Sequence, residues 1–276
     1  LADWRQLCEE YRHCKQVGGV TEASLYESAL TLRHFARIVG RCNSRQITQE
    51  VVDRFVLERA REVQRSTLNK DIRNLKTFIG WCRKNRYLNG EVQLRLLKEP
   101  QKPVKSLNGE QIKRLVHAAP LYRSMRIRIL LALGTGLRRG DIDSLRISDI
   151  DLDGGYIATQ SRKTGKSMGA RPVSASLMKE LREFVSSAHA GHDRLFRDKF
   201  NPRQWKKICQ EADLIGLKFH DLRKTFCSIL AQRGIPTAVT QRLLEHSSAD
   251  LTNKVYTNVD PVLRHAVDQI PVSDWL

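Results

Sequence analysis

The sequence predicts a mainly α protein in which an all-helical domain precedes a mixed α+β domain with a small antiparallel sheet. Three observations predict this class. Apolar residues recur at helical spacing in both halves of the chain, and strand-like segments are confined to residues 145–174. A stretch rich in proline and lysine divides the chain near residue 100. With 276 residues, 41% of them hydrophobic, the chain is long enough for two ordinary domains.

Residues 1–97 are predicted to form the all-helical domain. Within residues 21–40 one apolar stripe is followed by Gly40, which is typical of a helix C-cap; the stripe consists of Leu25, Ala29, Leu32, Phe35 and Val39. A second helix is predicted to begin at a Thr48 cap. A third helix, within residues 66–85, is expected to turn a similar stripe inward: Leu68, Ile72, Leu75, Ile79 and Cys82.

Two of these predicted helices carry rows of basic residues. One row is Arg33, Arg37 and Arg41, and the other is Lys70, Arg73 and Lys76. For a single helix such a row is usually a solvated face. Because the first 100 residues hold 19 basic and 12 acidic residues, a net charge of +7, two such rows favour a surface that faces phosphate groups.

Residues 98–106 are predicted to be a basic linker, because they contain two prolines and three lysines and few residues suited to a core. Lys102 and Lys105 in this segment are candidate DNA-binding residues.

Residues 107–276 are predicted to form the α+β domain. It begins with a hydrophobic staple and cap at Leu107 and Asn108. An apolar helix over residues 126–142 is expected to be broken by Gly134 and Gly136. Two strands follow, joined by a turn at residues 163–166, and the chain is helical again from Ser176. A last helix is expected to start at Asp260–Pro261 and to keep one face apolar: Val262, Leu263, Ala266, Val267 and Ile270.

The overall charge points to a polyanionic partner. Lys and Arg outnumber Asp and Glu by 48 to 30, which gives +18 and a pI of about 10.0. Nucleic acid is the leading interpretation, and a merely basic protein is the alternative. Six scattered cysteines without a C-x-x-C pair argue against a zinc site or a disulfide scaffold and are typical of the cytoplasm. The longest apolar run, residues 129–133, is too short to span a membrane.

Four places put polar groups where the apolar pattern predicts burial. They are Arg138 with Asp141, Lys163 in a predicted hairpin, His220 with Arg223 in HDLRKTF, and His246 with Tyr256. Taken singly, most have an ordinary explanation: a surface ion pair, an exposed lysine, a hydrogen-bonding histidine or a packed tyrosine. The His220–Arg223 pair is equally consistent with an internal salt bridge and with a shared anionic ligand.

Together these residue types suit one reaction. Two arginines can bind both non-bridging oxygens of a phosphodiester, and histidines add hydrogen bonds or proton transfer near neutral pH. A lysine can protonate a leaving alkoxide, and a tyrosine can act as a covalent nucleophile. The sequence has no acidic cluster suited to two metal ions and no G-x-x-x-x-G-K-[ST] motif for ATP. The set therefore favours phosphoryl transfer through a protein–DNA ester, with no metal or other cofactor.

The order T-G-L-R, K-T-G, H-x-L-R, H-S-S and Y resembles the tyrosine recombinase (phage integrase) family over nearly the whole chain. The resemblance implies a helical core-binding DNA-binding domain (SAM-like) at 1–97, a basic linker at 98–106 and a catalytic domain at 107–276. By position it implies phosphate-binding arginines, a general-acid lysine on the hairpin, two histidines, the nucleophile and a supporting carboxylate. By this resemblance Arg138 and Arg223 are the phosphate-binding arginines, and Lys163 is the general acid. His220 and His246 are the two histidines, Tyr256 is the nucleophile and Asp141 is the supporting carboxylate. Lys224 and Glu245 depart from the family pattern, which commonly has histidine and glycine there.

The resemblance further implies a site-specific DNA recombinase or integrase of a mobile element, acting at the nucleoid in a bacterial or phage context. It implies double-stranded DNA as partner, a 3′-phosphotyrosyl intermediate and a homotetramer on DNA. In the family the C-terminal tail commonly docks on a neighbouring protomer; packing within its own chain is the alternative. A type IB topoisomerase and a non-catalytic DNA-binding regulator of the same fold are the other functions considered.

Overall fold

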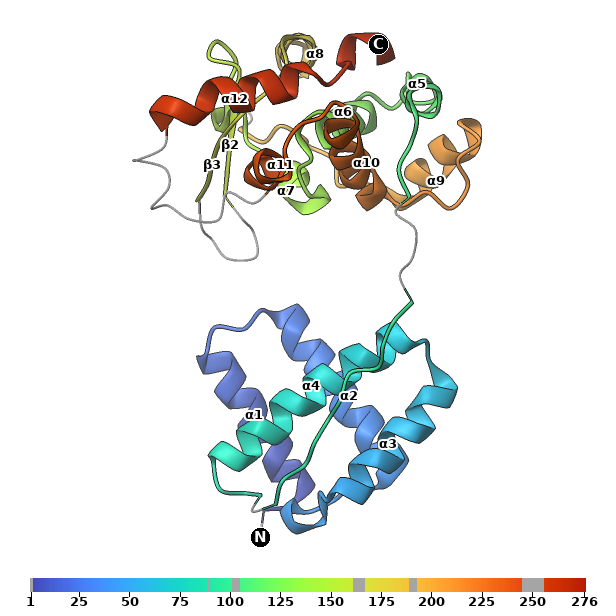
Figure 1. The fold of residues 1–276 in the computed structure, drawn as a ribbon, viewed down its shortest axis with the longest axis vertical. Coiled ribbons are helices and arrows are strands. Elements are labelled where there is room, and N and C mark those ends of the chain that lie inside the picture. Colours follow the sequence, from blue (N-terminus) through green and yellow to red (C-terminus); the bar gives the residue numbers. More distant parts are fainter. Residues whose placement is uncertain (1, 89, 101–104, 161–166, 189–192, 245–255) are drawn as a thin grey trace. The chain divides into compact units, whose positions relative to one another are not determined.

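The computed structural model describes residues 2–88, 90–100, 105–160, 167–188, 193–244 and 256–276 (Figure 1). The chain divides into two compact units, Leu1–Lys102 (unit 1) and Pro103–Leu276 (unit 2). The division falls inside the segment that the sequence predicts as a linker. Within the described ranges, no helix is long and apolar enough to cross a membrane.

Unit 1 is a bundle of helices with side-chain caps. Its elements are α1 (Trp4–Val17), α2 (Glu22–Val39), η1 (Ser44–Gln46), α3 (Gln49–Glu62) and α4 (Arg65–Lys84). Asp3, Thr21 and Thr48 each precede a helix and accept a hydrogen bond from a backbone N–H of its first turn. These caps satisfy donors that have no partner within the helix, so they explain where the helices begin. The predicted Thr48 and Gly40 caps are confirmed.

The core of unit 1 is built from the predicted stripes and an aromatic cluster. All five predicted apolar residues of α4 are buried, and so are Leu25, Leu32, Phe35 and Val39 of α2. Trp4 stacks on Phe35 with ring centroids 5.4 Å apart and meets Phe78 edge-on. The prediction for Ala29 is wrong: it is exposed and lines a groove between α1 and α2. A methyl group contributes little burial energy, so exposing it costs little.

A buried polar network ties three helices of unit 1 together. Nε of Arg59 donates to Asp71 at 2.9 Å, and the hydroxyl of Thr31 donates to the other carboxylate oxygen at 2.8 Å. Nη1 of Arg59 also donates to Glu62 at 2.8 Å. Because burial makes an unpaired charge costly, these contacts fix how α2, α3 and α4 pack.

Residues 91–99 differ from the all-helical prediction for unit 1. The last helix ends at Lys84, and the segment from residue 91 runs on without helix or strand. The backbone of this segment is hydrogen-bonded by side-chain amides, as a neighbouring strand would do. The amide of Gln49 bonds to the N–H and the carbonyl of Gln93, and the amide of Asn69 bonds to the N–H and the carbonyl of Leu97. A helix would have to lose these bonds and would meet Pro100, which disfavours the helical conformation at the residue before it.

Unit 2 combines helices with a small sheet. Its elements are α5 (Gly109–His117), α6 (Arg123–Thr135), α7 (Arg139–Asp143), η2 (Ile147–Asp149), β1 (Ile150–Asp151), β2 (Tyr156–Gln160), β3 (Ser167–Pro172), α8 (Ala175–Ala188), α9 (Pro202–Glu211), α10 (Phe219–Gln232), α11 (Thr237–Leu244), α12 (Tyr256–Asp268) and η4 (Val272–Trp275). The sheet is antiparallel in the order β1-β2-β3. The predicted fold class is therefore confirmed. Asn108 caps α5 as predicted, accepting from the N–H of Gln111 at 2.9 Å.

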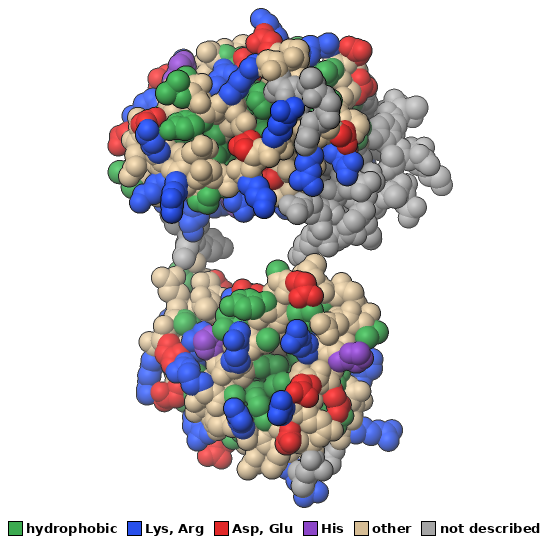
Figure 2. All heavy atoms as spheres, turned by 180° about the vertical axis from the view of Figure 1, so that it is seen from behind, with side chains coloured by type: hydrophobic (Ala, Val, Ile, Leu, Met, Phe, Trp, Pro, Cys, Tyr) green, Lys and Arg blue, Asp and Glu red, His purple; other side chains and the backbone are tan. Residues whose placement is uncertain are grey.

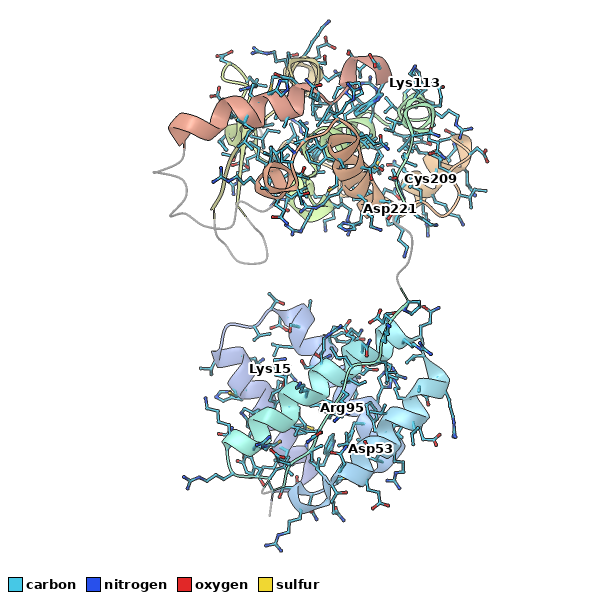
Figure 3. The ribbon with its side chains drawn as sticks, in the orientation of Figure 1. Lys15, Asp53, Arg95, Lys113, Cys209 and Asp221 are labelled. Carbon is cyan, nitrogen blue, oxygen red and sulfur yellow. The ribbon has the colours of Figure 1, made fainter. Side chains whose placement is uncertain are left out.

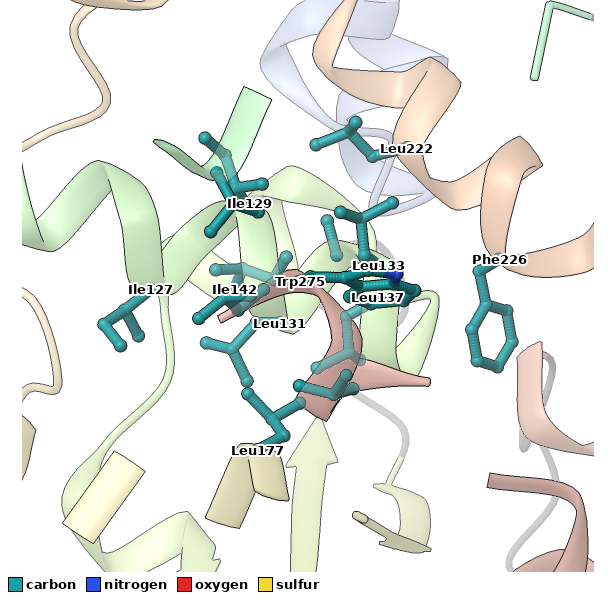
Figure 4. Close-up of a cluster of buried hydrophobic side chains, with 14 of the residues drawn as sticks. Ile127, Ile129, Leu131, Leu133, Leu137, Ile142, Leu177, Leu222, Phe226 and Trp275 are labelled. Atoms are coloured by element: carbon teal, nitrogen blue, oxygen red, sulfur yellow. The ribbon is translucent and has the colours of Figure 1, made fainter. Parts of the chain in front are cut away.

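Helix α6 is the centre of unit 2. It is buried nearly throughout, and Figure 4 shows Ile129, Leu131 and Leu133 among side chains from α8, α10 and η4. Gly134 does not break the helix, contrary to the prediction, because α6 continues to Thr135. A side chain at Gly134 would meet Leu177 of α8 at 2.5 Å, so this glycine permits close helix packing. The helix ends at Gly136, whose φ of 65° is left-handed.

The C-terminal tail packs within its own chain. Helix α12 begins at Tyr256, earlier than the predicted start at Asp260–Pro261, since its packing against β3 and α11 supports a longer helix than the proline signal indicates. Four of the five predicted apolar residues are buried in the core of unit 2, but Val262 is 48% exposed. Trp275 near the end is 1% exposed, and the guanidinium of Arg264 donates to the carbonyls of Gly154, Gly155 and Val173.

Candidate active site

The turn between α6 and α7 presents Arg138. Gly136 adopts the left-handed conformation that stops α6, and a side chain there would meet the Phe226 ring at 2.6 Å. The chain can turn this tightly only because glycine has no Cβ. Arg138 follows as the N-cap residue of α7, in an extended conformation and exposed. Of the two glycines predicted to break this helix, Gly136 does so, and Arg138 follows it directly after Leu137.

Helix α10 carries the two residues of HDLRKTF on which the sequence analysis centred. His220 is exposed, whereas Arg223 is only 9% exposed. Nη1 of Arg223 donates to the carbonyl of Gly136 at 2.5 Å, and Nη2 donates to the carbonyl of Leu244 at 3.2 Å. Arg223 therefore joins the T-G-L-R turn to the end of α11, two segments separated from it by 87 and 21 residues.

Lys224, the residue that departs from the family pattern, is held by its own helix. Its Nζ donates to Oδ1 of Asp221 at 2.7 Å, and Oδ2 of the same carboxylate accepts from the N–H of Lys218 at 3.0 Å. Asp221, labelled in Figure 3, is buried at the first turn of α10. Its pKa is lowered, because these hydrogen bonds and the charge of Lys224 outweigh the desolvation that would raise it. The positive charge of Lys224 is therefore balanced by the carboxylate of Asp221.

A further arginine, Arg171 on β3, belongs to the same cluster and was missed by sequence analysis. It is 1% exposed, and its Nη2 lies 3.5 Å from the carbonyl of Leu244, which also accepts from Arg223. Burial lowers the pKa of Arg171 to about 10, as do the charges of Arg223 and Arg138, while Asp141 opposes the shift. The available signal was an arginine in a short strand, G-A-R-P-V, whose neighbours are apolar.

Asp141 lies on α7 beside these guanidinium groups. It is 6% exposed, and within the described part of the chain its Oδ2 is buried without a hydrogen-bond partner. A buried carboxylate oxygen in this state is stabilised by neighbouring positive charge. Arg171 supplies that charge, since the two residues are close enough to interact electrostatically.

The cluster has an excess of positive charge. Among the described residues, Arg138, Arg171, Arg223 and Lys224 provide four cations and Asp141 and Asp221 provide two carboxylates, so the excess is two with His220 neutral. Preorganised cations of this kind favour an anionic ligand, because the cost of bringing them together has already been met by folding.

His220 is shifted toward its neutral form. Partial burial lowers its pKa below the ordinary 6.5, and Arg223, Lys224 and Arg138 lower it further, while Asp221 opposes them. A neutral imidazole near pH 7 can accept a proton, which a protonated one cannot.

The side chains of three predicted catalytic residues are not described. Lys163 and His246 lie outside the described residues. Tyr256 is the first residue of α12, and its side chain is also outside the description. The structure thus brings together Arg138, Asp141, His220 and Arg223 of the predicted set. Within the described ranges, no group of three or more His, Cys, Asp or Glu residues could hold a metal ion.

The first of the two predicted basic rows lines a groove in unit 1. Arg33, Arg37 and Arg41 lie along a groove of about 750 Å³ between α1 and α2, together with three residues that the sequence analysis did not single out: Arg5, Arg12 and Lys15. Figure 2 shows a face of unit 1 on which Lys and Arg side chains surround hydrophobic ones, and Figure 3 marks Lys15. Arg41 stands beyond the end of α2 at Val39, so it is not part of a helical row.

Lys70, Arg73 and Lys76 of α4 are not among the residues that line that groove. Lys70 pairs with Glu27 at 2.5 Å, as Arg37 in the groove does with Glu62. Arg73 and Lys76 are exposed and make no ion pair with any described residue. Lys105 is exposed, and Lys102 lies outside the described residues.

Comparison with known proteins gives the family. Residues 105–262 match the phage integrase family. The chain is 29% identical over 224 residues to the tyrosine recombinase XerA of Pyrococcus furiosus, which covers 76% of each protein. It is 28% identical over 244 residues to the XerA of Saccharolobus solfataricus, which covers 85% of this chain and 81% of that protein.

Solved structures share the fold. A lambda integrase dimer bound to a core site has a TM-score of 0.71 at 17% identity and covers 89% of this chain and 96% of its own. The Tn1549 transposon integrase in complex with circular intermediate DNA has a TM-score of 0.70 at 18% identity and covers 91% of this chain and 94% of its own. The fold agrees with the family match, which spans more than half of the chain. This chain therefore belongs to the phage integrase family and is a tyrosine-type site-specific recombinase.

Proposed function

We propose that this recombinase cuts and rejoins duplex DNA through a 3′-phosphotyrosyl bond to Tyr256. The phenolic oxygen of Tyr256 attacks the scissile phosphorus and the bond to the 5′ oxygen breaks, so a tyrosyl ester replaces a deoxyribose ester. His220 takes the phenolic proton, and Lys163 protonates the departing 5′ oxygen. Because one phosphodiester replaces another, neither ATP nor a metal ion is required to conserve the bond energy.

The phosphate is bound by Arg138 and Arg223 in this proposal, with a hydrogen bond from His246 and support from Asp141. Charge accumulates on the non-bridging oxygens in the transition state, and two fixed guanidinium groups stabilise it more than they stabilise the starting diester.

One observation carries the proposal. Arg223 donates to the carbonyl of Gly136, two residues before Arg138, and to the carbonyl of Leu244, two residues before His246. Motifs far apart in the sequence therefore meet around one cation, in a cluster whose described residues have an excess of two positive charges. A structural ion pair would leave no such excess, whereas a scissile phosphodiester offsets one of these charges and the dianionic transition state offsets both.

DNA binding is proposed to involve both units, with 1–97 as the core-binding domain, 98–106 as the linker and 107–276 as the catalytic domain. Arg33, Arg41, Arg73, Lys76 and Lys105 are exposed and make no ion pair with a described residue, so they are the first candidates for phosphate contacts. Arg37 and Lys70 would first have to leave Glu62 and Glu27. Lys102 is proposed from the sequence alone. The site of action is the cytoplasm, at the nucleoid.

Strand exchange between two duplexes requires four cleavage events, and we propose that a homotetramer assembles on the DNA to provide them. A lambda integrase tetramer bound to a Holliday junction has this fold, with a TM-score of 0.73 at 18% identity, covering 92% of this chain and 80% of its own. Docking of the tail on a neighbouring protomer would require Trp275 to leave the core of unit 2, where it is 1% exposed.

The covalent step is tested with DNA that carries a recombination site and a nick close to the expected cut. Wild type is expected to form a protein–DNA adduct that resists denaturation in detergent, because the released fragment diffuses away and cannot reseal the strand. Tyr256→Phe is expected to bind the same DNA and form no adduct. An adduct of equal yield with Tyr256→Phe would exclude Tyr256 as the nucleophile, and no adduct with wild type would overturn the proposed chemistry.

A further inference from the structure

Arg171 is a buried cation whose role the proposed chemistry leaves open. It lies on β3, opposite Ile157 of β2, and 1% of it is exposed. An arginine cannot shed its charge at physiological pH, so its burial is costly unless the surroundings supply negative potential. A buried arginine is therefore tolerated only where hydrogen bonds and nearby negative charge offset the desolvation of its guanidinium.

Two features of unit 2 supply that negative potential. The carbonyl of Leu244 is at the C-terminal end of α11, where the helix dipole is negative, and it lies 3.5 Å from Nη2 of Arg171. The carboxylate of Asp141 interacts favourably with the guanidinium. Both belong to segments next to proposed catalytic residues, because Leu244 precedes His246 by two positions and Asp141 follows Arg138 by three.

Arg171 also connects these segments to the hairpin and to α10. Strand β3 begins at Ser167, whose partner across the sheet is Gln160, and the intervening residues include Lys163. Arg171 and Arg223 both donate to the carbonyl of Leu244, so the two guanidinium groups are held at one point. A displaced Leu244 carbonyl would take away one of the hydrogen bonds that hold Arg223.

We propose that Arg171 is a positioning residue for DNA cleavage, which fixes Arg223 and the C-terminal end of α11 by sharing the Leu244 carbonyl. It acts through Arg223 and does not itself touch the scissile phosphate. The inference rests on the proposed role of Arg223 in phosphate binding. A displacement of about 1 Å in such a group can lower a rate about 10²-fold, even when the substituted residue is remote from the reacting atoms.

A purely structural role is the competing explanation, and another buried arginine provides the matched control. Arg128 on α6 is 0% exposed, pairs with Asp143 at 2.8 Å and Asp198 at 3.2 Å, and stacks on Phe196. It is in the same unit and equally buried, but its partners are outside the cationic cluster. Arg128→Lys therefore reports what a buried guanidinium contributes to folding alone.

The experiment compares wild type, Arg171→Lys, Arg171→Met and Arg128→Lys for thermal unfolding, DNA affinity and single-turnover cleavage of the nicked site. We expect Arg171→Lys to bind DNA within about twofold of wild type and to cleave about 10²-fold more slowly. Arg128→Lys is expected to lose a similar amount of thermal stability and to keep its cleavage rate. Wild-type cleavage by Arg171→Lys would overturn the inference, as would an equal loss of cleavage in Arg128→Lys.

A second substrate distinguishes a role of Arg171 in positioning Arg223 from a general destabilisation of the fold. It can be used with either Arg171 variant, provided that the variant folds. In a methylphosphonate at the scissile position one charged oxygen is replaced by a methyl group, so the demand on Arg223 falls. The defect of the Arg171 variant relative to wild type should shrink at least about tenfold on this substrate. An undiminished defect would overturn the positioning role. Because wild type is assayed in parallel, a failure of the proposed cleavage chemistry would be visible as no adduct from any protein.

Discussion

His220 and Lys224 lie one turn apart on α10, and the surrounding charges set the protonation state of the imidazole. Desolvation and three cations lower the pKa of His220, while Asp221 raises it. Lys224 acts on this balance in two ways, since it repels the imidazolium directly and also neutralises Asp221 through a 2.7 Å contact. The departure from the family motif thus keeps the histidine neutral, and it bears on catalysis through the pH dependence of the rate.

We expect the single-turnover cleavage rate to fall on the acid side only below the ordinary histidine pKa of 6.5, because the lowered pKa keeps His220 neutral down to lower pH. Lys224→Gln removes one cation and frees Asp221, and both changes raise the pKa of His220. The acid limb of the pH–rate profile should therefore move to higher pH in Lys224→Gln and disappear in His220→Gln. An unchanged or downward shift in Lys224→Gln would contradict this assignment.

At the scale of elements, the turn between α6 and α7 depends on one glycine. Gly136 has a φ of 65°, and an added Cβ would lie 2.6 Å from Cδ1 of Phe226 and 2.8 Å from Cδ2 of Leu244. Its carbonyl also accepts from Arg223 at 2.5 Å. The same residue therefore ends a helix, lets α10 approach and anchors a proposed catalytic arginine.

Gly136→Ala is expected to lower the free energy of unfolding of unit 2 by about 2–4 kcal/mol, the sum of left-handed strain and overpacking. Cleavage should fall as well, because relief of the contact with Phe226 displaces the Gly136 carbonyl. Urea denaturation measures the first effect and the nicked-DNA assay the second. Gly140→Ala is the matched control: an added Cβ there meets nothing within 4 Å, so α7 should be unchanged or up to about 1 kcal/mol more stable. Equal stability of the two variants would refute the argument.

At the scale of the whole molecule, the net charge of +18 predicts DNA binding that weakens steeply with salt. The structure shows that the basic residues differ in whether a carboxylate already pairs with them. Arg73 and Lys76 of α4 are exposed, whereas Lys70 of the same helix is held by Glu27 at 2.5 Å. A cation already paired with a carboxylate releases fewer DNA counterions than a solvated one.

We expect Arg73→Gln and Lys76→Gln each to reduce the slope of log affinity against log salt by about 0.9, the value for one phosphate contact. The double variant Lys70→Gln/Glu27→Gln keeps the net charge and should leave the slope unchanged. Titrations of labelled duplex DNA over a range of salt concentrations measure the slopes. Unchanged slopes for both single variants would show that this part of α4 does not face DNA, and a lower slope for the double variant would place Lys70 at the phosphates.

Much of this protein was predictable from local sequence. Helical spacing correctly predicted the buried stripe of α4, and cap residues correctly marked the starts of α3 and α5. These features depend on residues within one or two turns of each other, which a sequence displays directly. The order of T-G-L-R, H-x-L-R and the other motifs identified the family before any contact was known.

Tertiary structure alone decided which groups those motifs contact. Ala29 is exposed at a groove, residues 91–99 are held by side-chain amides of α3 and α4, and the tail ends in the core of its own unit. The carbonyl partners of Arg223, 87 and 21 residues away, and the contact of Arg171 with the Leu244 carbonyl have no local signature. Such contacts arise when distant segments pack, and burial then determines which charges need partners and which carbonyls provide them. The sequence by itself determined the helices, the fold class and the residue types of the site, and packing decided how the arginines are held.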